Sequence, residues 1–110
     1  MGISKAEEFT SKENRISQYA KALSHPARIA ILKYLSKRRS CVCGDIVINI
    51  PLSQSTISQH LKELKDSGLI KGDVEGKKVC YCINEKEWSK VRKTFTDFLN
   101  ITIDLKDECC

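Results

Sequence analysis

Apolar residues recur at three- and four-residue steps in several parts of the chain, which is the spacing of a helix with one buried face. The clearest example is the segment 52–70. Its apolar stripe consists of Ile57, Leu61 and Leu64. Ser53 can cap the first turn, and Gly68 can end the helix because glycine readily takes the left-handed conformation found after a helix. We therefore expect a helix held on a core by this stripe.

Two further helices are expected before this segment and one near the end of the chain. Thr10 and Glu13 form a capping box for the first helix, Pro26 suits the first turn of the second, and Asn84 and Glu87 form a capping box for the last. The predicted apolar stripes are Ile16, Tyr19, Ala20 and Leu23 in the first helix, Ile29, Ile31, Leu32 and Leu35 in the second, and Trp88, Val91, Phe95, Phe98 and Leu99 in the last.

Residues 69–83 follow a different pattern, with a period of two. The alternating positions are Val79, Tyr81 and Ile83. Such alternation around a Glu75-Gly76 turn predicts two short strands joined as a β-hairpin. The tip of this hairpin is basic, because Lys77 and Lys78 follow the turn.

The front of the 52–70 helix carries short polar side chains and almost no charge, whereas a solvated helix face is usually rich in Lys and Glu. Amide and hydroxyl groups in this place can form hydrogen bonds with base edges in a DNA major groove. The residues predicted to contact DNA are Ser53, Gln54, Ser55, Thr56, Ser58 and Gln59 on the helix, and Lys77 and Lys78 on the hairpin. The alternative interpretation is a surface helix with a polar start.

A polar-faced helix followed by a basic hairpin resembles a winged helix-turn-helix. The segment SQSTISQHLKELKDSGLI, with LSHPARIAILKYL ahead of it, is similar in sequence to the ArsR/SmtB family of bacterial repressors. The resemblance extends over roughly residues 15–99. The resemblance implies a mainly α fold with a small β-hairpin wing, whose end helices form a homodimer interface. It also implies binding to an inverted repeat in double-stranded operator DNA. An aromatic last helix with little domain left to cover it supports the dimer, although an intramolecular core stripe is the alternative.

Composition is compatible with this interpretation. The chain has 110 residues, 41% of them hydrophobic, which suits a single domain over 1–110, with flexible ends expected at 1–10 and 100–110. A net charge of +5 and a pI of about 8.9 suit a polyanionic partner. Neither an apolar leader nor a membrane-length apolar segment is present, so we expect a cytoplasmic protein without membrane contact.

An enzyme is not expected, because the sequence contains no catalytic triad, glycine-rich phosphate loop or paired acidic motif. His25 and His60 stand apart from any nucleophile or carboxylate cluster, and we expect them to make local structural hydrogen bonds. The zinc site that some family members place on the last helix needs His and carboxylate pairs and is also not expected, because residues 88–100 offer only Asp97 as a ligand. No required cofactor is expected.

Six cysteines in a chain without a secretory signal favour metal binding, redox chemistry or burial over a disulfide scaffold. The motif CVCGD at 41–45 resembles the segment with which the arsenic-sensing branch of the family binds trivalent arsenic or antimony. Soft thiolates favour such ions and other thiophilic metals. We expect 41–50 to form a turn or two of helix, the first helix of the helix-turn-helix. Cys41 and Cys43 would then point about 200° apart, so binding one ion requires a non-helical segment.

The expected function is a repressor that releases its operator when arsenite, antimonite or another thiophilic ion binds Cys41 and Cys43. Distortion there would displace the helix that contacts DNA, and a ligand with higher affinity for the released state shifts the equilibrium.

Some family members supply a third sulfur from the position held here by Val47. Cys109 and Cys110, on a polar tail, are candidates for the missing ligand, and Cys80 and Cys82 are the next candidates because they alternate on a strand and share a face. A buried wing strand explains that second pair equally well.

The same thiols also suit an alternative signal. In a redox-responsive or persulfide-responsive repressor, Cys41 or Cys43 would form a disulfide with Cys109 or Cys110.

Overall fold

The computed structural model describes residues 7–38, 40–43, 50–75 and 78–103. The elements in chain order are α2 (Ser11–Ala22), α3 (Pro26–Ser36), β1 (Val42–Cys43), α5 (Gln54–Asp66), β2 (Ile70–Glu75), β3 (Lys78–Ile83) and α6 (Glu85–Leu99). This mainly helical arrangement with a β-hairpin confirms the expected fold class. None of the described helices is both long and apolar enough to span a membrane.

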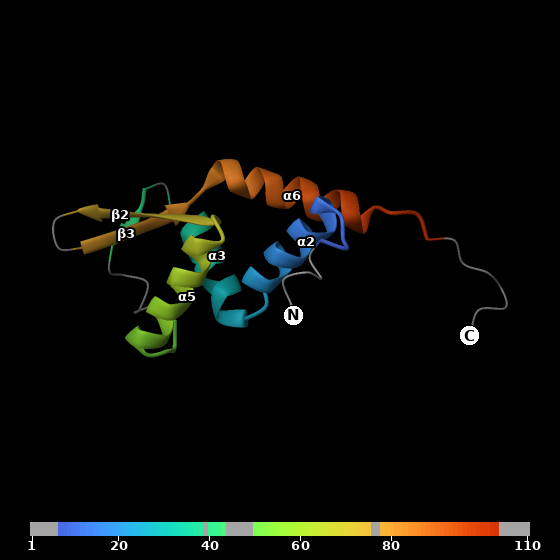
Figure 1. Ribbon diagram of the computed structural model, residues 1–110. Coiled ribbons are helices and arrows are strands. Elements are labelled where there is room, and N and C mark those ends of the chain that lie inside the picture. The colour runs from blue at the N-terminus through green and yellow to red at the C-terminus, as the bar shows by residue number, and fades with distance from the viewer. Residues whose placement is uncertain (1–6, 39, 44–49, 76–77, 104–110) are drawn as a thin grey trace.

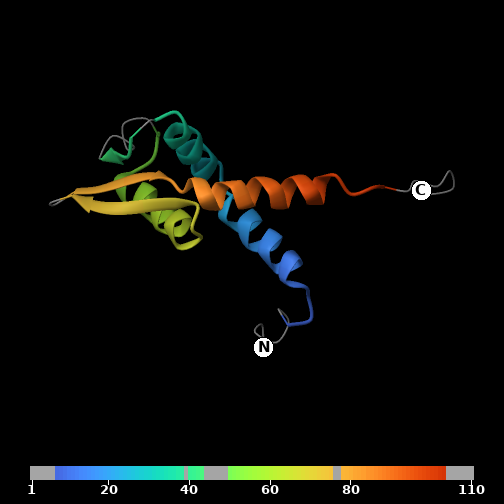
Figure 2. The same cartoon turned by 90° about the horizontal axis from the view of Figure 1, so that it is seen from above.

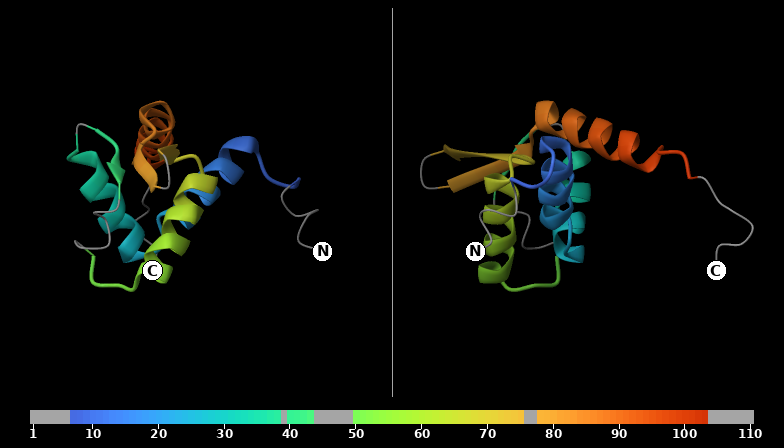
Figure 3. Two further views of the ribbon diagram at one scale, coloured as in Figure 1. Left: turned by 90° about the vertical axis from the view of Figure 1, so that its left-hand side faces the viewer. Right: turned by 45° about the vertical axis from the view of Figure 1, so that its right-hand side comes forward.

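The hairpin β2–β3 and helix α6 form one layer of the molecule, and helices α2, α3 and α5 lie on one side of it (Figure 1). Seen from above, the hairpin and α6 follow almost one line, and α2 passes beneath α6 at an angle (Figure 2). Helices α3 and α5 stand side by side below this layer (Figure 3). The helix expected over 52–70 is therefore α5, which packs on α3 and on the start of the hairpin.

Side-chain caps fix where the helices begin, as the sequence indicates. At α2, the Thr10 hydroxyl accepts a hydrogen bond from the Glu13 N–H at 3.1 Å, and the Glu13 carboxylate accepts one from the Thr10 N–H at 3.0 Å. Pro26 is the first residue of α3. At α6, the Asn84 side-chain oxygen accepts from the Glu87 N–H at 3.3 Å. These bonds satisfy N–H groups that the first helical turn leaves unpaired.

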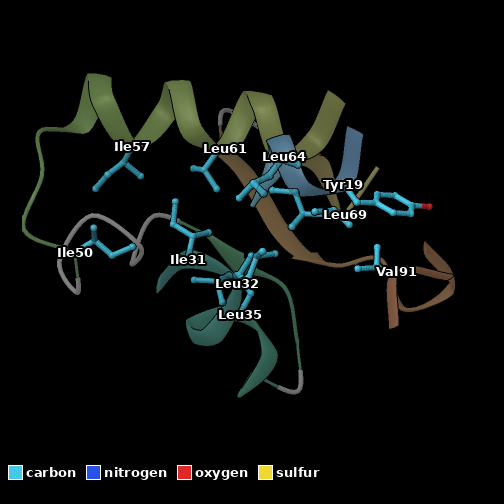
Figure 4. Packing of buried hydrophobic residues seen from close by; sticks show 13 residues of the cluster. Tyr19, Ile31, Leu32, Leu35, Ile50, Ile57, Leu61, Leu64, Leu69 and Val91 are labelled. Carbon is cyan, nitrogen blue, oxygen red and sulfur yellow. The ribbon is translucent and has the colours of Figure 1, made fainter. Parts of the chain in front are cut away.

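The core lies between the helices and the sheet, and α5 contributes its predicted stripe to it (Figure 4). Helix α6 adds Val91, and Trp88 and Phe95 are half-buried against the same cluster. Part of the α6 stripe is therefore an intramolecular contact. The buried cluster consists of Tyr19, Ala22, Ile31, Leu32, Leu35, Val42, Ile50, Ile57, Leu61, Leu64, Leu69, Ile70 and Val91.

Two residues of the stripes predicted for α2 and α3 are exposed. Ile29 is 40% exposed, because it precedes the buried Ile31 by two positions and so lies about 200° away around α3. Ala20 is exposed as well, and Ala22, three residues after Tyr19, takes its place in the core. Both expectations were wrong for the same reason. Each stripe included neighbouring apolar residues, and such residues extend around more of the helix than the face that packs on the core.

The sheet contains a strand that the sequence pattern does not predict. Val42 and Cys43 form β1, which pairs antiparallel with the outer edge of β3, giving the strand order β1-β3-β2. The expected helix is therefore wrong at these two positions, because their backbone groups pair with β3 instead. Residues 44–49, where the rest of that helix was expected, lie outside the described residues.

The predicted hairpin is confirmed, with strands paired from Ile70 opposite Ile83 to Glu75 opposite Lys78. The predicted turn residue Gly76 lies outside the described residues. Of the ends expected to be flexible, residues 7–10 and 100–103 are described and form neither helix nor strand. Their flexibility remains a prediction.

Candidate functional site

The N-terminus of α5 is held by its own hydroxyl groups. The Ser53 hydroxyl accepts from the Thr56 N–H at 3.3 Å and lies 2.9 Å from the Thr56 hydroxyl and 3.2 Å from the Ser55 hydroxyl. One turn further, Ile57 is 1% exposed and anchors this end of the helix on the core. The front of α5 is thus fixed in place while its outer face remains open.

That outer face has the composition predicted for it. All six residues predicted there are exposed: Ser53, Gln54, Ser55, Thr56, Ser58 and Gln59. The first turn carries no acidic residue, and the first charged side chain along the helix is that of Lys62. Exposed amides and hydroxyls without an opposing carboxylate can donate to and accept from a polyanionic partner.

The hairpin extends on the same side of the molecule as the N-terminal end of α5 (Figure 1). Lys78 begins β3, opposite Glu75, while Lys77 lies outside the described residues. Phosphate contact by these two lysines therefore stays a prediction.

Two histidines and an arginine join α3 to α5 behind the exposed face. The rings of His25 and His60 lie 4.4 Å apart between centroids, and Arg28 Nε donates to His60 Nδ1 at 3.1 Å. His25 Nδ1 also accepts from the Ala27 N–H at 3.0 Å, which caps α3. Burial, with smaller effects from His25 and Arg28, lowers the pKa of His60. His25 makes the local structural hydrogen bond expected of it, whereas the hydrogen bond of His60 is structural but not local, because Arg28 lies 32 residues away in sequence.

The cysteines are arranged differently from the sequence expectation. Cys41 is disulfide-bonded to Cys82, with 4.5 Å between their Cα atoms. Neither a disulfide between these two residues nor a prominent role for Cys82 was expected. The two cysteines meet because Val42 pairs with Tyr81. Cys41, the residue before Val42, therefore lies beside Cys82, the residue after Tyr81. The signal in the sequence that could have predicted this contact was the presence of two C-x-C motifs, which face each other when their segments pair as antiparallel strands.

The other predicted thiol ligands are only partly described. Cys43 is paired in register with Cys80, and Cys80 is 2% exposed. The two tail cysteines, Cys109 and Cys110, lie outside the described residues, so their predicted role remains open. Among the residues whose side chains the structure describes, which do not include Cys43, no group of three or more His, Cys, Asp or Glu could hold a metal ion.

A cavity of about 650 Å³ opens beside Cys41 and Cys82, between α3, the sheet and α6. Its charged lining residues are Arg38, Lys71, Arg92 and Glu85. Arg38 is oriented by Tyr34, because its guanidinium lies 4.7 Å from the ring centroid and donates to the hydroxyl. Since cations outnumber carboxylates in this lining, the cavity favours negative charge on a sulfur atom.

A second cavity, of about 410 Å³, lies between α2 and α6. Nearby, the Tyr19 hydroxyl donates to the Glu87 carboxylate and joins the two helices. Burial and this hydrogen bond raise the pKa of Tyr19. Beyond the cavity, residues 98–103 expose large apolar side chains: Phe98 46%, Leu99 73%, Ile101 59% and Ile103 72%. An apolar surface of this kind is typical of an interface.

Comparison with solved structures shows the fold. An ArsR-like transcriptional regulator from Rhodococcus sp. RHA1 superposes with a TM-score of 0.68 at 23% identity, covering 81% of this chain and 83% of that one. A homodimeric winged helix-turn-helix DNA-binding domain from Mycobacterium bovis superposes with a TM-score of 0.61 at 21% identity, covering 88% and 89%. Both likenesses concern the arrangement of the helices and the wing.

Comparison of sequences shows the family. The family model described as bacterial regulatory protein, arsR family, matches residues 25–71, which include α3, α5 and the start of β2. The arsenical resistance operon repressor of Staphylococcus xylosus is 33% identical over 90 residues, covering 82% of this chain and 78% of that protein. These are DNA-binding transcriptional regulators and not enzymes. The chain belongs to the arsR family of bacterial regulatory proteins.

Proposed function

We propose that this protein is a transcriptional repressor that binds operator DNA as a homodimer and releases it when a thiophilic metalloid binds. The observation that carries the DNA-binding part is the exposed, uncharged polar face at the front of α5, fixed from behind by Ile57 and His60. In the proposed complex, Gln54 and Ser58 contact base edges in the major groove, and Lys77 and Lys78 on the wing contact phosphates.

The homodimer is proposed to form through α2 and α6. The support is the apolar surface at the end of α6 and after it, where Leu99 and Ile103 are more than two-thirds exposed. The winged helix-turn-helix domain from Mycobacterium bovis, which has the same fold, is homodimeric. Two recognition helices related by a two-fold axis require two symmetric half-sites, so we propose an inverted repeat as the operator.

Trivalent arsenic or antimony is the proposed inducer, with Cys41 and Cys43 as ligands and other thiophilic ions as weaker substitutes. Because Val42 and Cys43 are extended and not helical, the geometric obstacle to chelation by two cysteines two residues apart does not arise. The similarity to an arsenical resistance operon repressor supports this choice of ion. No other cofactor is part of the proposal.

Release is proposed to operate through the position of α5. Only a short segment separates strand β1 from Ile50 and the Ser53 cap. A ligand that changes the conformation of β1 is therefore proposed to move the chain that leads into α5 as well. An ion that binds the released conformation more tightly shifts the protein toward it by that difference in affinity.

The experiment is a titration of the operator-bound protein with sodium arsenite under reducing conditions, followed by fluorescence anisotropy of labelled DNA. Wild-type protein should release the DNA. C41S and C43S should bind the DNA as the wild type does and fail to release it, because the thiols act on the conformational equilibrium and do not touch the groove. The control is Ser40→Ala, which changes the exposed neighbour of Cys41 without removing a sulfur. Normal release by the C41S/C43S double variant would contradict the proposed site.

A thiol redox signal is the second candidate, and the disulfide between Cys41 and Cys82 favours it. The same titration separates the two signals. A redox-responsive repressor releases DNA with oxidised glutathione and not with arsenite, whereas the metalloid-responsive repressor releases it with arsenite.

A further inference from the structure

We propose that Cys82, on the wing strand β3, is a ligand of the inducer, so that one ion joins β1 to the wing. This inference rests on the proposed function, in which Cys41 and Cys43 bind the ion. It supplies the third sulfur that the sequence of the CVCGD segment lacks.

Distance is the first support. The Cα atoms of Cys41 and Cys82 are 4.5 Å apart. Cys43 is two residues from Cys41, and residues two apart on a fully extended strand have Cα atoms about 6.6 Å apart at a rise of about 3.3 Å per residue. Cys82 is therefore the nearer partner of Cys41.

The sulfur positions agree with ligation. Two thiolates that each bind one ion at about 2.3 Å can lie no more than about 4.6 Å from each other. Cys41 and Cys82 are close enough to form a covalent bond, so a small rotation of the reduced side chains reaches this separation without moving the backbone. An ion can thus replace the disulfide with little rearrangement.

Access and charge are the second support. Cys41 is exposed, Cys82 is half-buried, and both line the cavity of about 650 Å³, so an ion can reach them from solvent. Thiolates are the ligand form, and Arg38, Lys71 and Arg92 line the same cavity against the single carboxylate of Glu85. Lys71 is also the cross-strand neighbour of Cys82.

The location of Cys82 gives the ion a route to both proposed DNA-contacting elements. Cys82 follows Lys78 on the wing strand, and Cys41 precedes the segment that leads to the Ser53 cap of α5. An ion that joins them fixes the wing relative to the approach to α5. In the proposed mechanism, the ion favours the conformation in which the wing and this segment hold its ligands together, and so shifts the protein toward that conformation.

The test is arsenic K-edge X-ray absorption on the reduced full-length chain with sodium arsenite, combined with the arsenite concentration needed for half-release of DNA. Wild-type protein should show three sulfur ligands. C82S should show two, and half-release should require about tenfold more arsenite or worse, since loss even of outer-shell support typically costs 10–100-fold in metal affinity. The control is Ser89→Ala, which changes the lining of the same cavity and keeps every sulfur. Three sulfurs and an unchanged half-release concentration in C82S would overturn the inference.

Failure of this inference can be told apart from failure of the proposed function. If C41S and C43S stop responding while C82S behaves as the wild type, only the role of Cys82 is wrong. If C41S still responds normally, the proposed inducer site is wrong. Operator binding by C82S and Cys82→Ala without arsenite verifies that both variants fold.

A second measurement uses the wild-type chain and needs no variant. Oxidised glutathione converts the two thiols of Cys41 and Cys82 to the disulfide and is itself reduced to two glutathione thiols. Because this bond removes both ligands, the oxidised protein should take up no arsenite with three-sulfur coordination and should regain it after reduction with a phosphine. Unchanged three-sulfur uptake by protein in which mass spectrometry maps the Cys41–Cys82 bond would also overturn the inference.

Discussion

At the scale of single residues, His60 is the side chain that links the inside of the domain to the proposed DNA-contacting face. It is 7% exposed, accepts a hydrogen bond from Arg28 and lies against the ring of His25. Protonation of His60 would abolish its acceptor nitrogen and place a cation beside the Arg28 guanidinium, with only Glu63 acting in the opposite sense. The folded state therefore holds the neutral imidazole.

This arrangement predicts that stability falls on mild acidification. The folded-state pKa of His60 lies below the ordinary value of 6.5, so the unfolded chain binds the proton first. Stability should be full above pH 6.5, fall as the pH is lowered through 6.5 toward the folded pKa, and change no further through this group below it. Urea unfolding between pH 7.5 and 5 measures the effect.

The matched variants are His60→Asn and His25→Asn. His60→Asn should remove much of this pH dependence, whereas His25→Asn keeps a capping side chain at the start of α3 and should retain most of it. An unchanged pH dependence in His60→Asn would show that another group is responsible.

The residue scale also shows what the sequence can and cannot predict. The structural role of His25 and His60 was predictable, because no catalytic partner stands near them in sequence. The exposed polar face of α5 was also predictable. On an amphipathic helix the apolar stripe packs on the core, so the uncharged polar residues opposite it are exposed. The partnership of Cys41 with Cys82 was not, because it depends on contact between segments that are 41 residues apart.

At the scale of elements, local signals fixed the boundaries that were predicted correctly. The caps at Thr10, Ser53 and Asn84 act within one helical turn, so a short stretch of sequence contains all of the information. Strand β1 was missed for the opposite reason. Its two residues become a strand only because the edge of β3 is available to them, and β3 lies far away in sequence.

The contact between α2 and α6 gives a prediction at this scale. Tyr19→Phe keeps the buried ring and removes the hydroxyl that donates to Glu87, leaving a half-buried carboxylate with Lys90 at 3.8 Å. We expect a loss of about 1 kcal/mol in the free energy of unfolding, measured by urea denaturation.

Tyr34→Phe is the control for this change. It also removes a tyrosine hydroxyl, but that hydroxyl contacts Arg38 at an exposed site, and we expect a loss of less than about 0.5 kcal/mol. Equal effects of the two substitutions would mean that the Tyr19–Glu87 contact contributes nothing specific to the docking of α2 on α6.

At the scale of the whole molecule, the proposed interface and the proposed DNA-contacting elements occupy different parts of the domain. The apolar end of α6 lies away from the hairpin, and the front of α5 lies on the hairpin side (Figure 1). A dimer formed through α2 and α6 would therefore leave both recognition helices exposed. The family resemblance indicated this division from the sequence. Which part of the α6 stripe stays exposed once Val91 is buried is known only from the folded chain.

The most direct test of the account is a fluorescence anisotropy titration of the inverted repeat upstream of the coding sequence and of a scrambled duplex, with wild-type protein and Gln54→Ala. We predict that wild-type protein binds the inverted repeat as two protomers per duplex and much more tightly than the scrambled DNA. Gln54→Ala should lose about ten- to a hundredfold in affinity for the repeat and little for the scrambled duplex, because it removes a base contact. Equal losses on both duplexes, or no preference of the wild type for the repeat, would contradict the claim that α5 reads the operator.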